Sequence, residues 1–126
     1  MLWAPKARKA DSVPTALTPL GEQLVFVADD GRHGFELWRS DGTPTGTRLL
    51  ADVLPGAAGA NPRELTRVGK HLFFVADDGR HGAELWRTDG TSAGTRLVKD
   101  IRRGPEGASP ARLTVVGSRL FFVAHD

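Results

Sequence analysis

The residues best suited to chemistry lie in a loop sequence that the chain contains twice. The sequence D-D-G-R-H-G spans Asp29–Gly34 and recurs 48 positions later as Asp77–Gly82. Each copy brings together carboxylates, an imidazole and a guanidinium, groups that can bind a polar ligand or exchange a proton. Adjacent loop carboxylates splay apart, and nothing in either loop favours a raised pKa for one of them. The loops are therefore candidate ligand-binding sites, and we predict no catalytic residue.

Metal binding has weaker support in the same loops. The Asp-Asp-Gly run offers the hard oxygen ligands that Ca²⁺ prefers, but the spaced D-x-[DN]-x-[DN]-G pattern of an EF-hand is missing. His33 and His81 occur once in each copy and are not paired at zinc-ligand spacing. The chain has no cysteine, which excludes thiolate chemistry and disulfides. We predict no metal site and no cofactor, with Ca²⁺ as the alternative.

A binding surface could form where these loops meet the connections between repeats. The connections read LPGAAGANP and RRGPEGASP. If each repeat folds as four antiparallel strands, they lie at the same end as the loop between the second and third strands. The predicted ligand-binding residues are Asp30, Arg32, His33, Asp78, Arg80, His81, Arg102 and Arg103. The competing interpretation is structural, because a residue that recurs in every repeat is usually there for packing or turn formation. On that interpretation Asp41 and Asp89 are turn residues, and Trp38 and Trp86 pack between neighbouring repeats.

The loop belongs to a repeat that accounts for most of the chain. Residues 24–71 and 72–119 align without a gap and are identical at 30 of 48 positions. The segments LTPLGEQL, LTRVGKHL and LTVVGSRL are one element seen three times. We predict a leader over 1–12, a first blade over 13–62, a second over 63–110 and the first two strands of a third over 111–126.

Each unit has the pattern of four antiparallel strands. In the second unit, RELTRVG is followed by KHLFFVAD, which is apolar on both alternating faces and so should be covered on both sides. The strand AELWRT then leads into Asp-Gly, a strong hairpin signal, and GTRLVKDI makes the fourth strand. No stretch has helical periodicity. The sequence therefore predicts an all-β fold of β-propeller-type blades, about 2.5 per chain, with a solenoid of shorter coils as the alternative.

The hairpin sequence carries a family resemblance. ELWRSDGT (Glu36–Thr43) and ELWRTDGT (Glu84–Thr91) resemble the signature of bacterial ELWxxDGT-repeat proteins. The order of an apolar strand, an Asp/Gly loop, an E-L strand and a D-G turn is also similar to the blade of TolB-type propellers. The resemblance covers nearly everything from Val13 onward. It implies a propeller from an exported bacterial protein, and it implies no particular activity.

Composition narrows the classes of partner. The chain has 126 residues, of which 40% are hydrophobic and 25% charged, and its net charge is +2. The basic residues are interspersed with Asp and Glu rather than forming the one-signed stripe of a nucleic-acid surface, so we predict no nucleic-acid partner. No apolar run approaches the ~20 residues of a membrane span, so we predict no membrane contact. The first twelve residues lack the apolar segment of a secretory signal, which leaves the compartment open.

Two and a half blades would leave apolar faces bare, which costs several kcal/mol per face at about 25 cal/mol per Å². We therefore expect a homo-oligomer that closes a ring through contacts between blades and half-blades, or a piece of a longer propeller. The predicted function is a non-enzymatic repeat module, a structural scaffold or one that binds a small molecule, a carbohydrate or a protein. The alternative is part of a propeller hydrolase or lyase with a metal in its channel.

Overall fold

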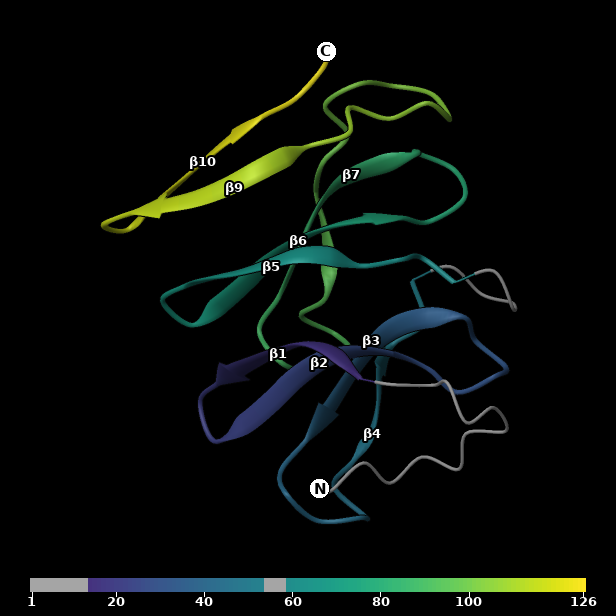
Figure 1. Ribbon diagram of the computed structural model, residues 1–126. Coiled ribbons are helices and arrows are strands. Elements are labelled where there is room, and N and C mark those ends of the chain that lie inside the picture. Colours follow the sequence, from purple (N-terminus) through teal and green to yellow (C-terminus); the bar gives the residue numbers. More distant parts are fainter. Residues whose placement is uncertain (1–13, 54–58) are drawn as a thin grey trace.

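The computed structural model describes residues 14–53 and 59–126, and this part of the chain contains ten strands and no helix (Figure 1). It therefore has no helix that could cross a membrane. The predicted leader over 1–12 lies outside the described residues. The strands are β1 (Thr15–Leu20), β2 (Gln23–Asp29), β3 (Phe35–Ser40), β4 (Arg48–Ala51), β5 (Arg63–Val68), β6 (His71–Asp77), β7 (Ala83–Thr88), β8 (Arg96–Lys99), β9 (Ala111–Val116) and β10 (Arg119–Val123).

The strands form three antiparallel sheets that follow chain order. Two sheets have four strands, β1-β2-β3-β4 and β5-β6-β7-β8, and the third has the pair β9-β10. The register repeats as well: Phe26 pairs with Trp38 in the first sheet, and Phe74 pairs with Trp86 in the second. The predicted all-β fold with blade-like four-stranded sheets is confirmed, and the three sheets lie within the three predicted units.

The sheets stack face to face with their first strands close together (Figure 1). Strand β1 contacts β5, and β5 contacts β9; no other strands from different sheets make an extensive contact in the described part of the chain. Neighbouring sheets therefore meet along one side and diverge on the other. This splayed arrangement is the one that adjacent blades of a propeller adopt.

The main hydrophobic core lies between the first two sheets. Alternation along β2 sends Val25 and Val27 to this core and Phe26 to the opposite face, where it packs with Ala28 and Trp38. The buried members of the main core are Leu20, Val25, Val27, Leu37, Leu50, Ala60, Leu72, Phe74 and Ala76. Both faces of the second strand are thus covered, which explains why its sequence is a continuous apolar run rather than an alternating one.

Each connection between two sheets forms backbone hydrogen bonds with the sheet before it and with the sheet after it. After β8, Gly107 forms an isolated parallel bridge with Ala83 at the start of β7, and the Ser109 N–H donates to the Ala83 carbonyl at 3.0 Å. The Ala108 carbonyl then accepts from the N–H of His125, just beyond β10, at 2.8 Å. The first connection repeats this pattern 48 positions earlier. Each connection therefore ties the third strand of one sheet to the second strand of the next.

Candidate functional site

The D-D-G-R-H-G loops join β2 to β3 and β6 to β7, and each folds around its second aspartate. Asp30 Oδ1 accepts hydrogen bonds from the backbone N–H groups of Arg32 and His33, at 2.8 and 2.9 Å. Asp30 Oδ2 lies 2.7 Å from His33 Nδ1. Asp78 makes the same three contacts with Arg80 and His81 in the second loop. In each copy, one carboxylate holds a turn closed and orients the following imidazole.

These contacts favour the ionised form of the carboxylate. Burial raises the pKa of Asp30, but the hydrogen bonds from the backbone of Arg32 and His33 and from the His33 side chain outweigh it, so the pKa lies below its ordinary value. The pKa of Asp78 is lowered in the same way, again against burial. The carboxylates are thus anions partnered inside their own loops, which suits a structural role better than proton transfer.

The lowered pKa values predict a loss of stability in acid. Because the unfolded carboxyls bind protons first as the pH falls, Asp30 and Asp78 contribute their stability fully above about pH 4. That contribution is lost as the pH falls through the lower pKa of the folded state. We expect the double variant Asp30→Asn/Asp78→Asn to lose less stability between pH 5 and pH 2 than the parent chain. Denaturant unfolding at several pH values measures this, and parallel pH profiles would contradict it.

The predicted arginines differ in their exposure and in their partners. The side chains of Arg32 and Arg80 are exposed at the tips of their loops, and Arg103 is exposed in the second connection. Arg102 pairs through its guanidinium with Glu106, at 2.5 Å, and donates its backbone N–H to Glu84. In the described residues, no hydrogen bond or ion pair joins one loop to the other. A shared ligand-binding mouth therefore stays a prediction, and the pairs that the structure brings together are Asp30 with His33 and Asp78 with His81.

One buried side chain that makes three hydrogen bonds was not among the predicted site residues. Glu84, the first residue of the second E-L-W, is fully buried. Its Oε1 accepts from the N–H of Ile101 at 3.1 Å, and its Oε2 accepts from the N–H groups of Arg102 and Ala108, at 3.0 and 3.1 Å. One carboxylate in β7 thus gathers both ends of the connection that leads to the next sheet.

Glu36 has the same role in the first sheet. It is also fully buried, and it accepts from the N–H groups of Val53 and Ala60, at 3.0 and 3.1 Å. The register places Glu36 opposite Ala28 and Glu84 opposite Ala76, so a small side chain faces the carboxylate in both sheets. A glutamate inside a strand with two buried faces was the signal in the sequence, because a charged residue is rarely fully buried unless it is partnered.

The D-G-T loops after β3 and β7 are closed hydrogen-bonded turns. Asp41 Oδ1 accepts from the N–H and the hydroxyl of Thr43, at 3.0 and 2.6 Å, and the Thr43 hydroxyl accepts from the N–H of Gly46. The bonds from Thr43 lower the pKa of Asp41, and the equivalent bonds from Thr91 lower the pKa of Asp89. The interpretation of Asp41 and Asp89 as turn residues is confirmed.

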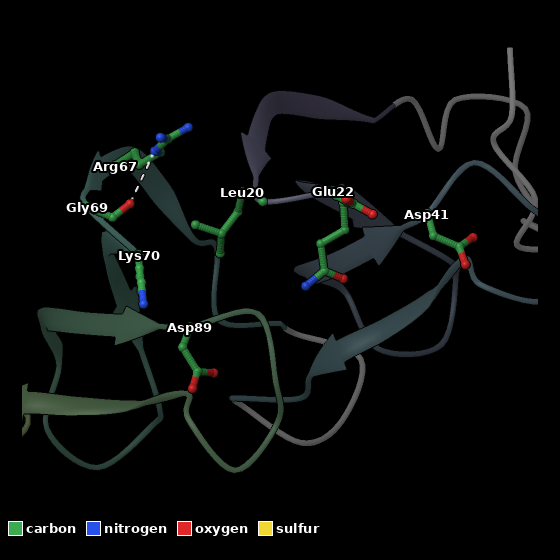
Figure 2. Close-up of a pocket in the computed structure, with 9 residues that line it drawn as sticks. Leu20, Glu22, Asp41, Arg67, Gly69, Lys70 and Asp89 are labelled. Atoms are coloured by element: carbon green, nitrogen blue, oxygen red, sulfur yellow. Dashed lines mark hydrogen bonds between the residues drawn. The ribbon is translucent and has the colours of Figure 1, made fainter.

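A cavity of about 540 Å³ lies between the first two sheets, at the end of the strands opposite the D-D-G-R-H-G loops. Figure 2 shows side chains of both signs around it, contributed by the β1–β2 and β5–β6 turns and by the D-G-T loops. The charged residues that line it are Glu22, Asp41, Arg67, Lys70 and Asp89. The sequence analysis did not predict this cavity, because the cavity forms only where two sheets meet.

In residues 14–53 and 59–126, no group of three or more metal-ligating side chains is placed to hold an ion. The polar groups are instead bonded chiefly to the backbone of their own repeat. Comparison of the chain with protein-family models, curated proteins and solved structures finds no match.

Proposed function

We propose that the chain is a non-enzymatic scaffold of propeller-type blades that assembles with other copies of itself. The polar residues that recur in the repeat support a scaffold. Asp30 and Asp78 hold loops closed, and Glu36 and Glu84 hold the connections between sheets. Chemistry on a ligand would require such groups to face the solvent or a cleft, whereas these groups face their own backbone. The resemblance to ELWxxDGT-repeat and TolB-type blades accords with this interpretation.

The apolar face of the third sheet carries the proposal of assembly. Val25 and Val27 in β2 are 0% and 4% exposed, because the second sheet covers them. The residues at the same repeat positions in β10 are Phe121 and Val123, which are 53% and 59% exposed. An equivalent face is thus a core in one sheet and a bare surface in another. Contiguous exposed apolar surface of this kind usually marks an interaction site.

A mass measurement in solution tests the proposal. We expect the chain, whose monomer mass is 13.6 kDa, to sediment as a multiple of that mass. The double variant Phe121→Lys/Val123→Lys should shift the population to the monomer, because burying two cations in an apolar contact carries a large desolvation penalty. Phe35→Lys is the matched control, since Phe35 is also an exposed aromatic residue but lies in β3.

A parent chain that is folded and strictly monomeric over a wide range of concentrations would contradict the proposal. A double variant that assembles as well as the parent chain would show that β10 is not part of the contact. Circular dichroism of all three proteins checks that the substitutions leave the sheets intact.

A further inference from the structure

Within the described residues, the third sheet has an open strand edge as well as a bare face, and the repeat specifies what fits that edge. We propose that the edge of β10 binds a β-hairpin of the E-L-W-R-[ST]-D-G-T pattern as the third and fourth strands of the blade. This inference rests on the proposed function, because it names the partner of the same half-blade. Addition of a strand to a free sheet edge is an established mode of peptide recognition.

Strand β10 already has the geometry of a second strand in a complete sheet. Its pairings Leu120 with Val115 and Phe121 with Thr114 repeat, 48 positions on, those of Leu72 and Phe73 with β5. The register shift after this pair also recurs in the same place. In the second sheet, the other edge of the equivalent strand β6 pairs from Leu72 to Asp77 with β7, the E-L-W strand. In the third sheet, β10 pairs only with β9 within the described chain.

The end of β10 is anchored before any hairpin is added. The His125 N–H donates to the Ala108 carbonyl at 2.8 Å, just as the Asp77 N–H donates to the Ala60 carbonyl at 3.1 Å in the complete sheet. The edge is therefore held in its final geometry. Binding then costs less conformational entropy than it would if the strand had to be ordered at the same time.

The second sheet supplies the surface against which the hairpin would pack. Leu50 in β4 is only 2% exposed, and its carbonyl accepts from the Ser92 hydroxyl of the next sheet at 2.6 Å. The residue at the same repeat position in β8 is Val98, which is 42% exposed. The hairpin of a complete third blade would cover Val98 in the way that the second blade covers Leu50.

Contacts between the first two sheets show why a D-G-T turn is specified. The Gly90 carbonyl, in the second D-G-T loop, accepts from Gln23 Nε2 at 3.3 Å and from Arg39 Nη1 at 3.2 Å. The corresponding donors on the second sheet are His71 and Arg87. A glycine carbonyl at the turn of the incoming hairpin would meet both of them.

Direct pairing of two β10 edges from two copies fits the structure less well. Antiparallel pairing of identical edges places the apolar faces of both half-blades on the same side of the sheet. It would also place two copies of the second sheet on the other side, competing for the area beneath one four-stranded blade. The hairpin completes the blade without this conflict.

The test is a titration of the intact chain into a labelled synthetic peptide with the sequence of residues 83–99, AELWRTDGTSAGTRLVK. Fluorescence anisotropy reports binding, and backbone amide NMR reports whether β10 receives the peptide. We expect saturable binding with shifts concentrated in Arg119–Val123. In the intact chain, Val98→Lys should weaken peptide binding at least tenfold. Val116→Lys should change it less than twofold, because Val116 is also exposed but lies in β9.

No binding at millimolar peptide, or equal binding by the Val98→Lys variant, would overturn the inference. A peptide in which Trp86 is replaced by alanine serves as the matched ligand control and should bind more weakly. The outcome is separable from that of the proposed function. A chain that assembles but ignores the peptide disproves only the hairpin, and a monomeric chain that binds the peptide through β10 disproves only the self-assembly.

Discussion

Replacing Glu84 with alanine should lower the free energy of unfolding by about 3 kcal/mol or more, the largest effect we expect from a polar substitution. The variant would leave the N–H groups of Ile101, Arg102 and Ala108 without their acceptor. Each buried donor left unsatisfied costs roughly 1–3 kcal/mol. Since small domains are stable by only about 5–15 kcal/mol, the variant should unfold at much lower denaturant concentration, or fail to fold.

Glu106→Ala is the matched control for this experiment. Glu106 lies in the same connection and is largely exposed, and among the residues that the structure describes it pairs only with the Arg102 guanidinium. Its removal should change the free energy of unfolding by less than about 1 kcal/mol, the usual range for a surface ion pair. Glu84→Gln distinguishes the contribution of side-chain packing from that of the hydrogen bonds. The amide fills the same space as the carboxylate but turns an NH₂ group toward backbone donors. A Glu84→Ala variant as stable as the control would show that the buried carboxylate does not hold the connection.

Gly107→Ala should destabilise the chain by about 3 kcal/mol or more, because a methyl group does not fit where the connection meets β7. Gly107 has a φ of +71°, and a Cβ at this position would lie 2.4 Å from the Ala83 nitrogen and 2.6 Å from the Ala83 oxygen. Both are backbone atoms, so no side chain can rotate away. The parallel bridge between Gly107 and Ala83 would have to open.

Gly117→Ala isolates this effect, since Gly117 has a similar φ of +62° but open space around it. Both variants restrict the unfolded chain alike and both place alanine in the left-handed region, which costs roughly 1–2 kcal/mol. The difference between them therefore measures the steric contact alone. Equal losses in urea unfolding would contradict the close approach of the two backbones.

The strand architecture could be predicted because its signals are local. The apolar run in β6, the Asp-Gly turn after β7 and the 48-residue period each constrain a short stretch of chain. The role of Glu84 could not be predicted in the same way, because its partners lie 17 to 24 positions further along the chain. The cavity between the sheets was missed for a similar reason, since its lining comes from turns that meet only after stacking.

The D-D-G-R-H-G loops show what residue types alone can predict about a site. Aspartate, arginine and histidine in D-D-G-R-H-G indicated a ligand site, which stays a prediction, and the structure adds that the aspartate and histidine are bonded to each other. The bulge in the first strand of each sheet is a shared backbone feature that residue types do not indicate. Ala16, Glu64 and Arg112 occupy the same repeat position with φ between +56° and +58°. Their side chains have nothing in common, so no pattern of residue types could reveal this backbone conformation.

The central claim is that buried carboxylates fasten each connection and so join the blades. Native-state hydrogen exchange of the amides of Ile101 and Ala108 tests it most directly, because both lie outside any sheet and are held by Glu84. We expect these two amides to exchange as slowly as the central amides of β6, since opening them requires the blade contact to unfold. Exchange at the rate of an exposed loop would contradict the account.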